Sequence, residues 1–131
     1  MTGLDTNVIV RFLTQDDPAQ SALANGLIGS LTAENPGFLS REAMVETVWV
    51  LERAYGMARP RIAAALERLL EAEELVIEAA DDVGLALHRY GRGGAGFADH
   101  MILIAGARAG CGKTFTFDRK AAAAPGRALL A

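Results

Sequence analysis

A chain of 131 residues that is 51% hydrophobic is long enough to bury the core of one domain, and we expect a single domain over residues 1–131. No apolar run approaches the roughly 20 residues that span a bilayer, and the first residues lack the layout of a signal peptide. The only cysteine, Cys111, excludes an internal disulfide or a cysteine-based zinc site. These features predict a soluble, cytoplasmic protein with no membrane partner. The net charge of −3 argues only weakly against a nucleic-acid partner.

Short apolar segments alternate with helical patterns along the chain. The expected strands are Leu4 with its neighbours and residues 37–40, 75–77 and 114–117. The expected helices follow these strands or lie between them, and cover residues 8–13, 18–31, 41–55, 60–70, 82–90 and 99–109. Their expected caps are Asp17, Ser40 and the pair Asp81 and Asp82.

This alternation predicts an α/β fold, a three-layer α/β/α sandwich with a small parallel sheet. In such sheets, sites form beyond the carboxyl ends of the strands. Asp5 follows the first expected strand and Asp118 follows the last. We therefore expect these two carboxylates to meet at one edge of the sheet.

Four carboxylates in all occur where a strand ends or within a helical segment: Asp5, Glu46, Asp99 and Asp118. Taken singly, each has a structural explanation, because aspartates cap helices and glutamates occupy helix surfaces. Taken together, they would form an acidic pocket that must bind a cation or hold protons. Such a pocket points to metal-dependent phosphodiester chemistry.

Other suggestive motifs do not have the right order. Gly112, Lys113 and Thr114 resemble the end of a phosphate-binding P-loop, but they lead from a helix into a strand instead of from a strand into a helix. The glycine-rich residues 91–96 precede a helix without a preceding strand. His100 adjoins Asp99, yet neighbouring residues on a helix point in different directions.

Residues 4–8 and 11–18 resemble the opening of PIN-domain ribonucleases, most closely the VapC toxins of toxin–antitoxin pairs. Glu46, within residues 43–51, falls at the position of the helical glutamate of that family. Residues 97–99 resemble its third acidic motif, and residues 116–118 resemble its fourth. The four motifs follow one another in the family's order along the whole chain.

The resemblance implies a PIN-like sandwich with the activity of an endoribonuclease that depends on Mg²⁺ or Mn²⁺. It implies RNA as the substrate, a homodimer, and neutralisation by a VapB-type antitoxin. Metal ligands would be Asp5 and Asp99, with Asp118 completing the cluster and Glu46 binding a second ion or orienting the attacking water. Residues that position ligands or substrate would be Thr6, Asn7 and Thr116.

Two other functions remain open from the sequence. An aspartate-based phosphatase or a receiver domain would use Asp5 as a nucleophile, but Asn7 stands where the phosphatase pattern has a second aspartate. A non-catalytic PIN-like scaffold would bind RNA or a partner without cutting. The presence of all four carboxylates argues against the scaffold.

Overall fold

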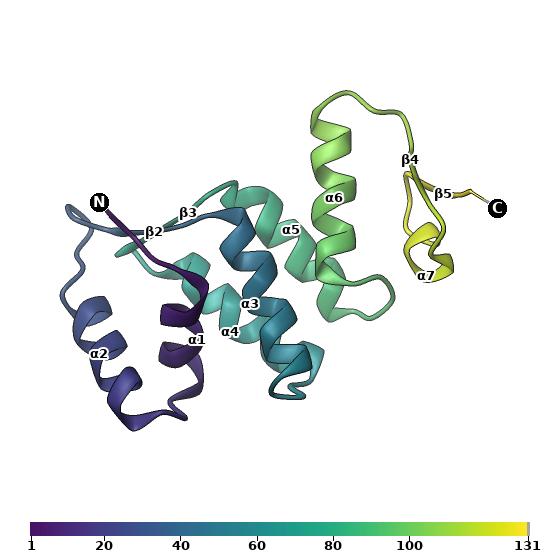
Figure 1. Ribbon diagram of the computed structural model, residues 1–131. Coiled ribbons are helices and arrows are strands. Elements are labelled where there is room, and N and C mark those ends of the chain that lie inside the picture. Colours follow the sequence, from purple (N-terminus) through teal and green to yellow (C-terminus); the bar gives the residue numbers. More distant parts are fainter. Residues whose placement is uncertain (131) are drawn as a thin grey trace.

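Helices dominate the fold, which a computed structural model describes for residues 1–130 (Figure 1). The helices are α1 (Thr6–Thr14), α2 (Pro18–Gly29), α3 (Arg41–Arg53), α4 (Arg59–Glu71), α5 (Ala80–Gly91), α6 (Phe97–Arg108) and α7 (Arg119–Ala122). The strands are β1 (Thr2–Gly3), β2 (Gly37–Leu39), β3 (Leu75–Ile77), β4 (Thr114–Thr116) and β5 (Arg127–Leu129). Among the described residues, no helix combines the length and apolar character that crossing a membrane requires.

Every strand pairing is parallel, as the alternation of strands and helices predicts. One sheet has the order β1-β2-β3, with Thr2 opposite Gly37 and Gly37 opposite Leu75. The predicted α/β class with a small parallel sheet is confirmed. The expectation that the last predicted strand joins this sheet is not met, because β4 pairs with β5 in a second sheet. The sequence pattern did not predict β5.

The core lies between the first sheet and helices α1, α3, α4, α5 and α6. Its largest fully buried side chains include Leu39 of β2, Met44 and Leu51 of α3, and Ile62 and Leu66 of α4. Together with the buried Val48 of α3 and Leu69 of α4, these residues recur every three or four positions, so each helix turns one apolar face inwards. The helices in turn hold the ends of the strands in fixed positions.

Two predicted helix caps are confirmed and one is wrong. The Asp17 carboxylate accepts a hydrogen bond from the Gln20 amide at 3.0 Å, and Ser40 Oγ accepts one from the Ala43 amide at 3.1 Å. Helix α5, however, begins after Ala79, whose backbone is left-handed with φ of 53°. The aspartates Asp81 and Asp82 therefore lie within its first turn, where the positive end of the helix dipole stabilises their negative charges.

The last part of the chain forms a separate unit, residues 113–130, which we call the C-terminal unit. It contains β4, α7 and β5, and α6 lies between this unit and β1 (Figure 1). The Arg127 guanidinium donates a hydrogen bond to the Asp99 carbonyl of α6, and Thr114 lies close to Gly106 of the same helix. These contacts hold the C-terminal unit on α6.

Candidate functional site

Two adjoining hollows form an acidic cleft. The first, of about 400 Å³, lies at the start of α1 and includes Asp5, Thr6, Asn7 and Glu46 in its wall. The second, of about 880 Å³, lies between α3 and α6 and includes Glu46 and Asp99. Glu46 and Trp49 line both hollows. The structure thus places three of the four predicted carboxylates around one cleft.

Asp5 is held in place by the turn from β1 into α1. It is the N-cap of that helix, and its Oδ1 accepts a hydrogen bond from the Thr6 amide at 2.7 Å. Thr6 is buried, whereas Asp5 and Asn7 are exposed. The cap explanation and the site explanation for Asp5 are therefore compatible, since the cap fixes an exposed carboxylate at the wall of the cleft.

Glu46 and Asp99 approach the cleft from two different helices. Glu46 is exposed in the middle of α3, three residues before Trp49 and so on the same side of the helix. Asp99 is half-buried in the first turn of α6, where its Oδ2 accepts a hydrogen bond from the Gly96 amide at 3.3 Å. The helix dipole of α6 favours a negative charge at this position.

Asp118 lies apart from the other three carboxylates. It caps α7 through a hydrogen bond from the Lys120 amide at 2.8 Å, and its own amide donates to Thr116 Oγ1 at 3.0 Å. Thr116 therefore positions Asp118, but Asp118 lines neither hollow of the cleft. The reason is that β4 belongs to a second sheet and does not lie beside β1.

The donor groups of the cleft are of the kind that bind a hard divalent cation. Carboxylate oxygens are the ligands that Mg²⁺ prefers, so Asp5, Glu46 and Asp99 have suitable chemistry. Among residues 1–130, however, no three histidine, cysteine, aspartate or glutamate side chains are close enough to hold one ion. A single chain in this arrangement presents carboxylates around the cleft without converging them into a ligand set.

A polar network that the sequence did not reveal borders the first hollow. Arg11 donates hydrogen bonds to Asp16 at 3.2 Å and to the Tyr55 hydroxyl at 3.0 Å, and Tyr55 donates to Asp16 at 2.7 Å. The Tyr55 hydroxyl is the largest influence that lowers the pKa of Asp16, followed by Thr14. Arg11 belongs to the first family-like motif, whereas no local pattern links Tyr55 to it, 44 residues away.

His100, next to Asp99, faces the interior. Its exposed fraction is 5%, and neither ring nitrogen has a hydrogen-bond partner within residues 1–130. Burial lowers its pKa, and the positive charge of Arg89 lowers it further. The neutral imidazole belongs to the packing around α6 and lines neither hollow, in keeping with the sequence argument against a ligand role.

The fold and the cleft define an α/β domain in which three carboxylates, from the end of β1, from α3 and from α6, line one cleft. The family model for the PIN domain matches residues 4–126, and the chain belongs to the PIN-domain family. PIN domains are typically nucleases and generally use divalent metal ions, so the chain is nuclease-like. No curated protein gives a significant match to the chain.

Proposed function

We propose that this protein is an endoribonuclease that hydrolyses RNA phosphodiester bonds with Mg²⁺ or Mn²⁺. The observation that carries the proposal is the cleft. Carboxylates from three separate segments, Asp5, Glu46 and Asp99, line adjoining hollows in a chain of a typically nucleolytic family. A divalent ion, when bound, would supply Lewis-acid activation of water and of the scissile phosphate.

The chain's own residues would act by holding oxygen ligands in place. Asp5 and Asp99 are both fixed by backbone amides, which costs little rotamer freedom when a ligand binds. Glu46, on a helix surface, has the freedom to bind an ion or orient a water molecule. Thr6 and Asn7 would position Asp5 and the substrate at the same turn.

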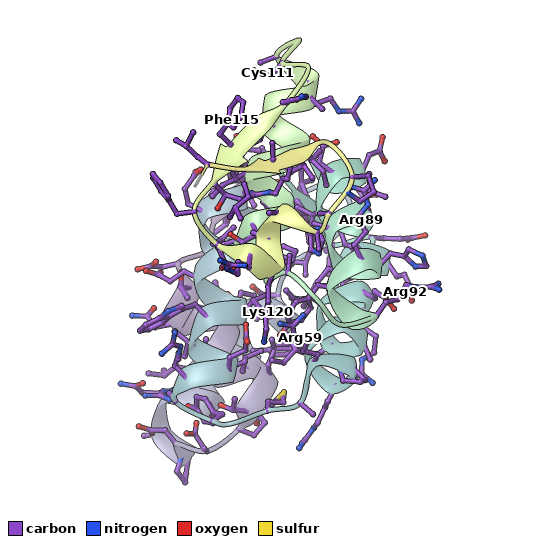
Figure 2. The ribbon with its side chains drawn as sticks, turned by 90° about the vertical axis from the view of Figure 1, so that its right-hand side faces the viewer. Arg59, Arg89, Arg92, Cys111, Phe115 and Lys120 are labelled. Carbon is purple, nitrogen blue, oxygen red and sulfur yellow. The ribbon has the colours of Figure 1, made fainter. Side chains whose placement is uncertain are left out.

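Basic residues on the side of the molecule that carries the C-terminal unit would attract the phosphates of the RNA backbone. Figure 2 shows Arg59, Arg89, Arg92 and Lys120 on this face, around the C-terminal unit. Arginine and lysine neutralise phosphates, and this term supplies most of the sequence-independent affinity for nucleic acids. The arrangement supports RNA as the substrate despite the negative net charge.

Substitution of the cleft carboxylates tests the proposed function. Asp5→Asn and Asp99→Asn should each lower metal-dependent RNA cleavage by about 10²-fold or more, the scale expected when a charge-stabilising group is lost. Asparagine is also a good helix cap, so thermal unfolding should show a folded Asp5→Asn protein. Glu67→Gln, at an exposed carboxylate of α4, is the matched control and should cleave like the parent.

Purified parent protein would be assayed on labelled RNA with Mn²⁺, with Mg²⁺ and with EDTA, beside calorimetric titration with Mn²⁺. Full activity in either asparagine variant would contradict the assignment of that carboxylate. A parent that neither takes up Mn²⁺ nor cleaves RNA would favour the non-catalytic scaffold.

We further propose that the protein is a VapC-type toxin, neutralised by a VapB-type antitoxin. The second hollow has an apolar wall, with Trp49 59% exposed and Ile102 56% exposed, and Glu42, Glu46 and Glu52 also line it. An amphipathic helix with one basic side chain would suit such a groove. Co-purification with the product of a neighbouring small reading frame, abolished by Trp49→Glu, would support this role.

A further inference from the structure

Two strands of the protein have an edge without a partner. In the order β1-β2-β3, β1 is an outer strand, and in the second sheet β4 pairs on one side only, with β5. A two-stranded sheet is only marginally stable, and parallel strands are normally buried on both faces. Both edges therefore offer hydrogen-bonding groups that another parallel strand would satisfy.

The strand that joins β1 cannot come from the same chain in this arrangement. The C-terminal unit is held on α6 by the hydrogen bond from Arg127 to the Asp99 carbonyl and by the close approach of Thr114 to Gly106. A Cβ atom added to Gly126 would lie in van der Waals contact with Leu103 of α6, 3.5 Å from its Cδ1 atom, so the two segments also pack together there. With α6 between them, β4 stays away from its own β1 (Figure 1).

Charge divides between the two parts of the chain. The C-terminal unit has four basic residues and one acid, Asp118. Residues 1–112 have nine basic and fifteen acidic residues, and three of those acids line the cleft. The unit of one copy is therefore electrostatically complementary to the rest of another, which favours their encounter.

The C-terminal unit also leaves large apolar side chains in solvent. Phe115 of β4 is 61% exposed and Phe117, just after the strand, is 78% exposed. Leu129, which pairs with Thr116 at the end of β5, and the next residue, Leu130, are exposed as well. Figure 2 shows Phe115 at the surface of the unit. Contiguous exposed apolar side chains of this kind commonly mark a protein interface.

The two strands with an open edge, β1 and β4, are each followed by a carboxylate at the same distance along the chain. Gly3 ends β1 and Asp5 follows two residues later, while Thr116 ends β4 and Asp118 follows two residues later. If the strands pair in parallel with their last residues aligned, both carboxylates lie at the same edge of the joined sheet. That edge is the acidic cleft, where Asp118 is missing from the single chain.

We propose that two copies of the chain pair β1 of one with β4 of the other, so that the partner's Asp118 completes the cleft formed by Asp5, Glu46 and Asp99. Each copy offers one β1 edge and one β4 edge, so a two-fold dimer satisfies both and contains two shared sites. The catalytic meaning of this arrangement rests on the proposed ribonuclease function, whereas the pairing itself does not.

Disulfide trapping tests the pairing without reference to activity. In a Cys111→Ala background, a Gly3→Cys chain is mixed with a tagged Thr116→Cys chain, and the mixture is oxidised. Position 3 has no atom within 4 Å of an added Cβ, so cysteine fits there. We expect a mixed disulfide dimer, because paired strands bring Cα atoms within bridging distance. A Val76→Cys chain, altered at β3 on the opposite edge of the sheet, is the control and should not cross-link to Thr116→Cys.

Activity complementation tests the sharing of the site. Asp5→Asn and Asp118→Asn proteins, each inactive alone, are mixed in equal amounts after partial unfolding and refolding. Random pairing makes half of the dimers mixed, and each mixed dimer has one intact site, so about a quarter of the parent activity should return.

The two measurements separate the failure of either proposal. A parent that does not cut RNA but gives the mixed disulfide overturns the ribonuclease function and supports the pairing. An active parent without complementation overturns the shared site. Absence of the mixed disulfide, or an internal disulfide in a monomeric chain with both cysteines, overturns the pairing in favour of closure within one chain.

Discussion

At the scale of single residues, the candidate site uses side chains that also stabilise the fold. Asp5 and Asp118 each cap a helix, and Asp99 accepts a hydrogen bond from a backbone amide at the start of α6. A carboxylate with such a cap is fixed before any ligand arrives. Asp16, beside the cleft, also stabilises the fold, because its carboxylate accepts hydrogen bonds from both Arg11 and Tyr55.

The Asp16 network predicts a loss of stability in acid. Hydrogen bonds from Tyr55 and Thr14, and the charge of Arg11, lower the pKa of Asp16 in the folded protein. Its stabilising contribution is therefore complete above the unfolded pKa of about 3.9. That contribution is lost as the pH falls through the lower folded value. Asp16→Asn should lower the Tm at pH 7 and weaken the decline of Tm between pH 5 and pH 2.

Thermal unfolding across this pH range makes the comparison, with Glu34→Gln as the control at another exposed carboxylate. The control should follow the parent. An Asp16→Asn protein with the parent's Tm and the parent's acid profile would show that the network contributes nothing to stability.

At the scale of elements, the entry into β2 is the most tightly packed point near the site. A Cβ atom added to Gly37 would lie 2.7 Å from Leu31 Cδ1 and 2.8 Å from Leu4 Cδ1. Gly37 pairs with both Thr2 and Leu75, so it joins all three strands of the first sheet. Because Gly37 has no side chain, Leu31 and Leu4 can pack directly against the sheet, next to the turn that contains Asp5.

Gly37→Ala should therefore destabilise the protein by about 1–3 kcal/mol, the usual cost of overpacking a core. Gly26→Ala is the matched control, because Gly26 is exposed within α2 and has no atom within 4 Å of an added Cβ. It should stabilise the protein by about 0.5–1 kcal/mol through the helix preference of alanine. Urea unfolding measures both changes, and equal effects of the two substitutions would contradict this account of the packing.

Local patterns were sufficient to predict most elements and the places of the carboxylates along them. Asp17 and Ser40 mark helix starts through short-range chemistry that a sequence displays directly. The pairing of β4 was not predictable in this way, because the sequence of a short strand such as residues 114–116 does not specify which other strand it pairs with. The strand β5, residues 127–129, is too short and too polar at Arg127 to differ from a tail.

For the site, the sequence identified the carboxylates but did not determine how close together the fold brings them. Asp5, Glu46 and Asp99 could be named from strand ends and from motifs that resemble the family, and the fold brings them to one cleft. Asp118 could be named too, but its distance from Asp5 depends on which sheet accepts β4. The tie between Arg11 and Tyr55 depends on the packing of α1 against the end of α3 and has no sequence signature.

At the scale of the whole molecule, the division of charge predicts salt-sensitive association. Because the C-terminal unit is basic and the remainder acidic, added salt should screen their attraction. The Kd of the proposed dimer should rise several-fold between low and high NaCl. Lys120→Gln should raise it at low salt, whereas Arg61→Gln, at an exposed residue of α4 outside the unit, should not.

Sedimentation equilibrium at several protein concentrations measures the Kd in each case. A dimer that tightens with added salt would indicate an interface dominated by apolar contact. Equal effects of Lys120→Gln and Arg61→Gln would show that the position of the charge is unimportant.

The placement of Asp118 across α6 from Asp5 has a consequence for the abundance of active enzyme. When each complete site requires two chains to meet, the number of sites at low concentration grows with the square of the amount of protein. A few stray copies then cut almost nothing, whereas a modest rise in synthesis produces a disproportionate burst of cleavage. The separation of Asp118 from Asp5 within one chain would thus set a threshold concentration of protein below which little RNA is cut.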